Sequence, residues 1–416
     1  MFLWQKNKTA PITNPEPVNA ANTQPIQPTI PPKTLSTAKA IPLRDSKYRP
    51  APFAISFEGK GPDGNTGAIK ELNGISYDVW YDTGSVALVI PYAALDRSKI
   101  SVIQTKTSYH TFGLCDLVKG NLFLKSQDGT YYTLEDFVFY ARYTPDGQDA
   151  PEDRGIPNNW GGGIAGGIPK CIGNPKDPNS IKSVSYALTE KYSPDHMGVG
   201  IISEPGADIK VGYKTLKSYL SFIPAELSNI NSDIAWLTKP STMNMWTFID
   251  TVPGFSVQFK FAPTADVPNP PSSLIAEDLV CTIDTGAPDL EVQISKDDPQ
   301  LSDPYKPYFK GPLQGWMGKD TQTFGSCTLG MGTQVDITCK CDTKSVSYRF
   351  DVDTQTRLAD GSSPAIVYIG KYNSGAPFAN LPKRFNLGNT VYFFWHGVLF
   401  DLKNERFGIY IAEPKK

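Results

Sequence analysis

Short apolar runs with a period of two dominate the chain and predict β-strands. Residues 75–81 alternate and are aromatic, and residues 255–261 alternate strictly between apolar and polar positions. A period of two gives a sheet one apolar and one polar face, so both segments are expected to be half-buried strands. Further β-rich runs lie at residues 86–91, 279–283 and 290–294.

Two other segments complete the predicted elements. Residues 180–192 have a helical pattern of apolar positions. The positions on that apolar face are Ile181, Val184, Leu188 and Tyr192. Residues 207–212 predict the strand that ends the first half of the chain. The pattern as a whole therefore predicts an all-β fold with one helical stretch.

The tripeptide Asp-Thr-Gly occurs twice, each time between two of the predicted strands. The copies are residues 82–84 and 284–286, followed by Ser85 and Ala287. A carboxyl group on a tight turn is held by the backbone, and glycine beside it lets another segment approach closely. Two such turns facing each other bring two carboxyl groups together, and like charges at that range retain a shared proton. The pair therefore predicts hydrolysis by a water held between two aspartates.

Composition removes several competing classes of function. The chain has 416 residues, of which 40% are hydrophobic, and it contains 35 Gly and 36 Pro, which suits two cores built from short strands and turns. With a net charge of −2 the chain has no excess of basic residues that would attract nucleic acid or a membrane surface, so neither partner is expected. There are 3 His and no His-Glu-x-x-His spacing, so we expect no metal and no cofactor.

The six cysteines predict disulfide bridges. Candidate pairs are Cys115 with Cys171, and Cys327 with Cys339 or Cys341, although spacing does not fix the pairing. Bridges favour an oxidising compartment, so we expect the protein to be secreted, periplasmic or in another acidic or oxidising compartment. The cytoplasm is the alternative, because no signal peptide is visible at the start of the sequence.

With these motifs the chain resembles the pepsin-like aspartic proteases of the peptidase A1 type. Each lobe of that family carries an apolar-apolar-Gly segment behind its Asp-Thr-Gly turn. Residues 164–166, Ile-Ala-Gly, are similar to the first, and residues 386–388, Asn-Leu-Gly, are similar to the second, with Asn386 a polar departure. Residues 398–409 are similar to the closing hairpin of the family. The resemblance covers about residues 45–416.

The resemblance implies a bilobal, all-β fold. Two duplicated, β-barrel-like lobes would enclose an active-site cleft, with a flap hairpin over it. Residues 45–237 would form the N-terminal lobe and residues 238–416 the C-terminal lobe. Residues 1–44 include a segment rich in Pro, Asn, Thr and Gln, which predicts a disordered tail, with a removed prosegment as the alternative.

The resemblance implies roles for the residues of this sequence that match the motifs of the family. Asp82 and Asp284 would be the catalytic pair. Residues expected to support the dyad are Thr83, Gly84, Ser85, Thr285 and Gly286. The threonines would cross-link the turns, the glycines would admit close backbone approach, and Ser85 would hold Asp82 charged. Ala287, which has no hydroxyl, suits the member that carries the proton.

The flap departs most from the family pattern. The best match to the family's Tyr-Gly pair is Phe112 and Gly113, and the position of its tryptophan partner is Val89. The tyrosine and the tryptophan that form this hydrogen bond in the family are both replaced, so neither replacement leaves a polar group without its partner. Phe112 is expected to cover the cleft as an apolar lid, with Tyr109 as a substitute candidate.

The predicted function is that of an aspartic endopeptidase. It would be a monomer that cleaves a polypeptide substrate at acidic pH. The alternative is a catalytically silent protein of the same fold that binds another protein or a carbohydrate-active enzyme, because a shared fold does not guarantee a shared activity. A secreted β-sandwich lectin or adhesin would explain the composition but would leave the twin motifs accidental.

Overall fold

The computed structural model divides the chain into two compact units, Met1–Lys33 and Thr34–Lys416. All residues that it describes lie in the second unit. They are residues 37–45, 53–71, 74, 76–108, 114–143, 164–192, 196–211, 214–224, 233–263, 268–269, 273–287, 290–294, 309–312, 325–328, 332–351, 365–369, 384–388 and 395–411.

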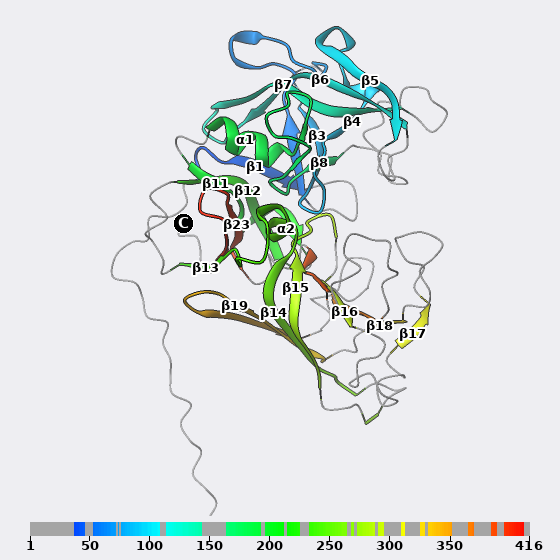
Figure 1. Ribbon diagram of the computed structural model, residues 1–416, viewed down its shortest axis with the longest axis vertical. Helices are drawn as coiled ribbons and strands as arrows, with labels where there is room; N and C mark the ends of the chain where they lie inside the picture. Colours follow the sequence, from blue (N-terminus) through cyan, green and yellow to red (C-terminus); the bar gives the residue numbers. More distant parts are fainter. Residues whose placement is uncertain are drawn as a thin grey trace, which may run out of the picture. The chain divides into compact units, whose positions relative to one another are not determined.

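The larger sheet has 13 described strands in the order β13-β24-β23-β11-β12-β1-β2-β3-β8-β4-β7-β6-β5 (Figure 1). Their bounds are β1 Ile41–Asp45, β2 Phe53–Phe57, β3 Tyr77–Asp82, β4 Val89–Pro91, β5 Ile100–Ser108, β6 Leu114–Lys125, β7 Tyr131–Arg142, β8 Ile164–Gly166, β11 His196–Val211, β12 Lys214–Pro224, β13 Ile234–Thr238, β23 Gly397–Asp401 and β24 Arg406–Tyr410. This sheet carries the first Asp-Thr-Gly turn at the end of β3.

The second sheet has 9 described strands in the order β17-β18-β21-β16-β22-β15-β14-β19-β20. Their bounds are β14 Val252–Lys260, β15 Leu274–Thr282, β16 Leu290–Ile294, β17 Phe309–Pro312, β18 Gly325–Thr328, β19 Gln334–Lys340, β20 Ser345–Asp351, β21 Ala365–Ile369 and β22 Arg384–Asn386. It carries the second turn after β15. The described part of the chain is thus all-β, with one motif in each sheet, as the bilobal pepsin-like fold requires. Neither strand order closes into a barrel within this part.

The predicted strands are present, with shifted ends. Residues 290–294 coincide with β16, and residues 279–283 overlap the end of the longer β15. Along β14 the side chains of Phe255, Val257 and Phe259 are at most 1% exposed, whereas their neighbours are partly exposed. The alternation in sequence therefore becomes alternation in burial. Of residues 86–91, only the last three form a strand, β4.

The predicted helix begins later than the pattern indicated. Helix α1 spans Val184–Tyr192, because the preceding Ile181–Lys182 forms strand β10 and pairs with β9, Cys171–Ile172. Ser183 caps the helix, and its Oγ accepts a hydrogen bond from the backbone N–H of Tyr186 at 3.0 Å. The other α-helix is α2, Met245–Asp250. Three short 3₁₀ turns occur at Pro62–Gly64, Tyr92–Ala94 and Arg97–Lys99. No helix in the described residues is long and apolar enough to cross a membrane.

The hairpin that closes the chain belongs to the first sheet. Strands β23 and β24 are antiparallel, and they join β11 and β13 respectively. The expectation of a hairpin at residues 398–409 is therefore confirmed by strands at 397–401 and 406–410. Strands β1, β23 and β24 all add to the first sheet, so segments close to both ends of the described chain support the strand that carries Asp82.

One apolar cluster runs through both sheets. It contains Phe53 and Phe139 from the first sheet and Phe255 and Phe259 from the second, all at most 1% exposed. Burying an aromatic side chain of this size contributes roughly 1.5–3 kcal/mol relative to leaving it exposed. The shared core therefore resists separation of the two sheets.

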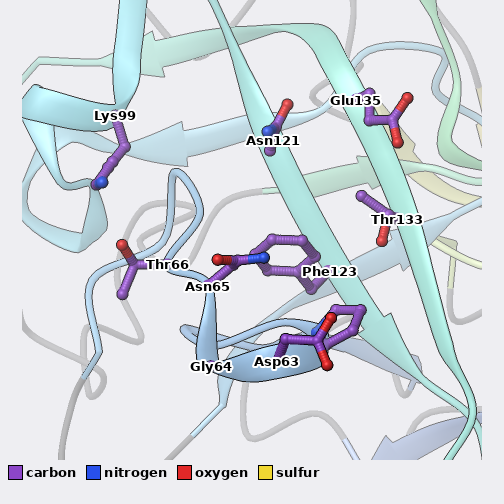
Figure 2. A pocket seen from close by; sticks show the side chains of 10 residues that line it. Asp63, Gly64, Asn65, Thr66, Lys99, Asn121, Phe123, Thr133 and Glu135 are labelled. Atoms are coloured by element: carbon purple, nitrogen blue, oxygen red, sulfur yellow. The ribbon is translucent and has the colours of Figure 1, made fainter.

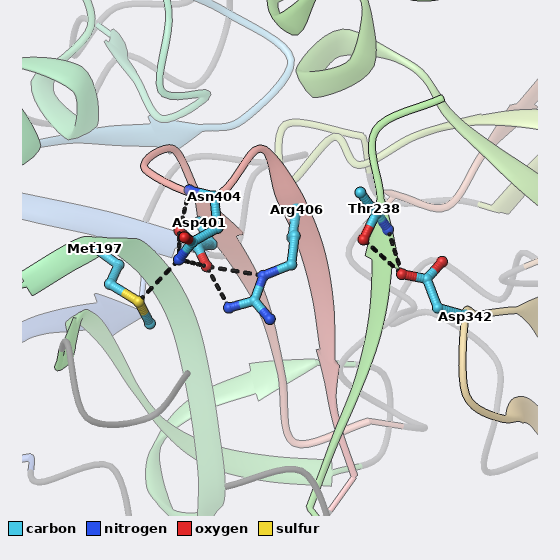
Figure 3. Close-up of polar contacts among 6 residues, drawn as sticks. All are labelled: Met197, Thr238, Asp342, Asp401, Asn404 and Arg406. Carbon is cyan, nitrogen blue, oxygen red and sulfur yellow. Dashed lines mark hydrogen bonds and ion pairs between the residues drawn. The ribbon is translucent and has the colours of Figure 1, made fainter. Parts of the chain in front are cut away.

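Polar contacts fix the closing hairpin and the join between sheets (Figure 3). Asp401 is fully buried and accepts hydrogen bonds from the guanidinium of Arg406 at 2.6 and 3.0 Å and from the side-chain amide of Asn404 at 2.9 Å. Asp342, after β19, accepts hydrogen bonds from the backbone N–H of Thr238 at 2.9 Å and from its hydroxyl at 2.6 Å. The second contact ties strand β13 of the first sheet to the second sheet.

The predicted disulfide bridges are wrong for the described cysteine side chains. Cys115, Cys171, Cys339 and Cys341 are not disulfide-bonded. Cys115 packs with Trp80 among buried apolar side chains, and burial raises the pKa of its thiol to about 11. The Sγ atoms of Cys339 and Cys341 lie 3.6 Å apart, beyond bonding distance. The expectation of an oxidising compartment rested on such bridges, so these thiols do not support it.

Replacing Asp401 by alanine is expected to lower the free energy of unfolding by about 3 kcal/mol. The change leaves buried donors unpaired, and Arg406, whose side chain is 17% exposed, recovers only part of its hydration. Urea unfolding or the melting temperature would measure the loss. Glu405→Ala is the matched control from the same turn: it breaks the ion pair of an exposed carboxylate with Lys239 and should cost less than about 1 kcal/mol. Equal stability of the two variants would contradict the prediction.

Candidate functional site

The two Asp-Thr-Gly turns have the same local construction. In the first, the backbone N–H of Gly84 donates to Oδ1 of Asp82 at 2.7 Å. In the second, the N–H of Gly286 donates to Oδ1 of Asp284 at 2.9 Å. A carboxylate that accepts from the backbone two residues later closes an Asx-type turn, which also fixes the side chain. Each aspartate is therefore held at the end of its strand by its own turn.

The threonines join the two turns by reciprocal hydrogen bonds. The N–H of Thr83 donates to Oγ1 of Thr285 at 3.0 Å, and the N–H of Thr285 donates to Oγ1 of Thr83 at 2.9 Å. Each hydroxyl then donates across to the other motif's strand, from Thr83 to the carbonyl of Ile283 at 2.6 Å and from Thr285 to that of Tyr81 at 2.7 Å. Both threonines are fully buried. The structure thus brings the two turns into direct contact.

Each glycine lies against the carboxyl group of the opposite turn. A Cβ added to Gly84 would lie 2.5 Å from Oδ1 of Asp284, and one added to Gly286 would lie 2.7 Å from Cγ of Asp82. No side chain fits at either position. The two carboxyl groups can therefore come together only because both turns carry glycine.

The two carboxyl groups form a coupled pair. Asp82 is 7% exposed, and its carboxyl is hydrogen bonded to that of Asp284. Burial is the main cause that raises the pKa of Asp82 well above its usual range, and the adjacent charge of Asp284 and their shared hydrogen bond raise it further. Hydrogen bonds from Ser85 and Gly84 act in the opposite direction. A pair of this kind retains one proton to a higher pH than an isolated aspartate.

The outer oxygens of the pair each face one side-chain donor. Ser85 donates its hydroxyl to Oδ2 of Asp82 at 2.6 Å. Asn386 donates its amide to Oδ2 of Asp284 at 3.2 Å. The sequence marked position 386 only as a polar departure from an apolar pattern and did not place it in the site. That departure was the available signal, since a buried polar side chain behind an Asp-Thr-Gly turn needs a partner.

A parallel crossing strand supports each turn from behind. Strand β8 pairs with β3, placing Gly166 opposite Asp82, and the N–H of Gly167 donates to the carbonyl of Asp82 at 2.6 Å. Strand β22 pairs with β15, and the N–H of Leu387 donates to the carbonyl of Thr282 at 2.9 Å. The support of the two turns is duplicated together with the turns themselves.

The flap prediction falls on residues outside the described part of the chain. Tyr109, Phe112 and Gly113 lie between β5 and β6, which are antiparallel and pair up to Ser108 opposite Leu114. A hairpin is therefore present at the expected place. The role of the three residues in covering a cleft stays a prediction.

A buried carboxylate anchors the base of this hairpin. Asp116 on β6 is 3% exposed and accepts hydrogen bonds from the hydroxyls of Tyr92 at 2.6 Å and Tyr143 at 2.5 Å and from the N–H of Lys106 at 2.8 Å. Burial raises the pKa of Asp116, but the hydrogen bonds from these groups outweigh it and hold the pKa below its usual range. The sequence prediction missed this network, because the partners come from three separate segments.

A polar hollow of about 570 Å³ lies elsewhere in the first sheet (Figure 2). Its lining includes Asp63, Lys99, Phe123 and Glu135. No residue of the two turns lines this hollow. Among the described residues, no group of three or more His, Cys, Asp or Glu side chains is placed to hold a metal ion.

Comparison with known proteins gives a likeness of structure only. No protein-family model matches the chain, and no curated protein matches it. In a search of solved structures, 132 chains match. One of them is the crystal structure of basic 7S globulin from soybean, with 12% identity over 90% of this chain and 96% of that chain and a TM-score of 0.46. A likeness at this level assigns no activity, so what this protein does is inferred from its own twin turns.

Proposed function

We propose that the protein is an aspartic endopeptidase with Asp82 and Asp284 as its catalytic pair. The observation that supports this most is the mutual contact of the two turns, in which each glycine admits the opposite carboxyl group and the threonines join the backbones. Structural turns do not require two carboxyl groups to be brought together at the cost of mutual repulsion. Strained or costly arrangements of this kind are typical of catalytic sites.

The chemistry follows from one shared proton. The ionised carboxyl takes a proton from a water held between the pair, and the water oxygen attacks the carbonyl carbon of the scissile peptide bond. The protonated carboxyl gives its proton to the carbonyl oxygen, which yields a tetrahedral diol. Collapse of the diol breaks the C–N bond. One diol hydroxyl gives its proton to the ionised carboxyl as the C=O bond re-forms, and the departing nitrogen takes the proton of the other carboxyl, which leaves the pair with one proton again. The reaction needs no covalent intermediate, because Asp82 and Asp284 exchange the roles of base and acid.

The pH dependence follows from the state of the pair. The active form carries one proton, so activity should fall at low pH when both carboxyls are protonated. It should also fall as the pH rises through the raised pKa of Asp82, when the shared proton is lost. The pair is expected to show two apparent pKa values that belong to both carboxyls together. Activity is therefore expected at acidic pH, on an extended polypeptide bound across the two turns.

Replacing either carboxyl of the pair, in Asp82→Asn or Asp284→Asn, is expected to abolish cleavage. Either change removes the proton exchange, and the loss is expected to be at least about 10²–10⁴-fold. The measurement is cleavage of a denatured protein from acidic to neutral pH, with and without a statine-type transition-state inhibitor. Asp78→Asn is the matched control, because Asp78 lies on the same strand β3 and its side chain is 41% exposed.

The result that would overturn the proposal is equally specific. A folded wild-type protein that cleaves nothing at any pH, also after removal of residues 1–33, which leaves strand β1 intact, would favour a catalytically silent binding protein of the same fold. Cleavage that survives both dyad substitutions would mean that another group carries the reaction.

A further prediction concerns the reciprocal hydrogen bonds between Thr83 and Thr285. Thr285→Val removes the acceptor for the buried N–H of Thr83 and the donor to the carbonyl of Tyr81. Leaving these two buried backbone groups unpaired should lower the free energy of unfolding by about 1–3 kcal/mol. The turnover number should also fall, because the two carboxyl groups are no longer held in fixed positions relative to each other. Thr285→Ser keeps the hydroxyl and should stay near wild type in both respects. A wild-type turnover number for Thr285→Val would show that the dyad does not depend on the cross-link.

A further inference from the structure

The two turns differ in where the polar side chain behind each carboxyl comes from. In the first, Ser85 lies in the turn itself, and the crossing strand has the apolar Ile164 opposite Trp80, two residues before Asp82. In the second, the turn position is the apolar Ala287. The crossing strand of that sheet has a polar residue at the place that corresponds to Ile164.

That polar residue is Asn386. Strand β22 places it opposite Thr282, two residues before Asp284, which is the same register as Ile164 relative to Asp82. The polar and apolar positions of the two turns are therefore exchanged. The first sheet combines a hydroxyl in the turn with an apolar crossing residue, whereas the second combines an apolar turn residue with an amide on the crossing strand.

The orientation of the Asn386 amide is fixed by its neighbours. Its Oδ1 accepts a hydrogen bond from the backbone N–H of Gly388 at 2.9 Å, and its Nδ2 donates to Oδ2 of Asp284 at 3.2 Å. An N–H group requires an acceptor, so the oxygen of the amide faces Gly388 and the nitrogen faces the carboxyl. Gly388 has a positive φ of 55°, a conformation that glycine adopts readily, and it turns its N–H back toward this oxygen.

We propose that Asn386 is a positioning residue that supplies the hydrogen-bond donor absent at position 287 and favours the singly ionised form of the carboxyl pair. This inference rests on the proposed function. The sequence alone assigned the proton to Asp284 because Ala287 offers no donor. With Asn386 in place, each carboxyl of the pair has one backbone donor and one side-chain donor. The environment of the pair is therefore balanced, which allows the proton to move between Asp82 and Asp284 during the reaction.

The consequence is a specific pH effect. A hydrogen bond donated to a carboxylate favours its charged form, so loss of the Asn386 donor should make the first ionisation of the pair less favourable. The pair would then stay doubly protonated to a higher pH. In Asn386→Ile, which copies the first sheet, the acid limb of the kcat/KM profile should move up by roughly one pH unit. The turnover number should fall several-fold, and KM should change little, because Asn386 lies behind the carboxyl.

Two further variants separate donation from mere structural support. Asn386→Asp has nearly the same shape and keeps an oxygen for the N–H of Gly388, but it replaces the donor by an acceptor. It should shift the acid limb upward at least as far as Asn386→Ile does, because a third carboxyl group adjoins the pair. The double variant Asn386→Ile with Ala287→Ser copies the complete first-sheet pattern and should return the acid limb toward its wild-type position.

The test combines these pH profiles with a readout that does not need turnover. In protein labelled with ¹³C at the aspartate carboxyls, NMR titration follows the carboxyl pair directly, with Asp82→Asn and Asp284→Asn for assignment of the signals. The expected result is a higher apparent pKa of the dyad in Asn386→Ile and Asn386→Asp, and recovery in the double variant. Folded Asn386→Asp that titrates like wild type would overturn the inference, even if the wild type cleaves protein. A shift seen in a protein that cleaves nothing would support the role of Asn386 and count against the proposed function alone.

Discussion

The reciprocal hydrogen bonds of Thr83 and Thr285 are the constraint on which the site depends. Each backbone N–H finds its acceptor only in the hydroxyl of the opposite turn, and both residues are fully buried. A small separation of the two sheets would therefore leave several buried polar groups without partners at once, at roughly 1–3 kcal/mol each. This penalty holds the two carboxyl groups together against their mutual repulsion, and the apolar core shared by both sheets acts in the same direction.

The carboxyl pair is a compromise between two opposing effects. Burial and the neighbouring charge raise the pKa of Asp82, whereas the donors Ser85 and Gly84 lower it. With burial alone both carboxyls would be neutral and no base would be present. With donors and free access to water both would ionise, and no acid would remain. The Asx-type turns resolve the conflict, because the same backbone N–H that fixes each side chain also favours its charged form.

Local pattern was enough to predict β3, β14, β15 and β16, because period-two alternation and β-branched residues act within a single segment. It failed where distant partners decide. The start of α1 depends on Ile181 pairing with Ile172, and Cys115 is buried among apolar side chains that come from several separate strands. The turn residues were found from their motif, but Asn386 was not placed in the site. Its role exists only because the parallel pairing of β22 with β15 brings it behind Asp284.

If the two turns act as proposed, Asn386 illustrates how a motif can change its residues and still supply the same hydrogen bonds. The requirement at Asp284 is a hydrogen-bond donor at the outer oxygen, and either of two nearby backbone positions can supply it. When the turn position is apolar, as Ala287 is, the crossing strand can supply the donor, since Asn386, which lies opposite Thr282, faces the same oxygen. An amide suits this place better than a hydroxyl, because its second polar atom accepts the N–H of Gly388 and fixes the donor's direction. Each carboxyl of the pair thus has one backbone donor and one side-chain donor, although the side-chain donor comes from the turn in one case and from the crossing strand in the other.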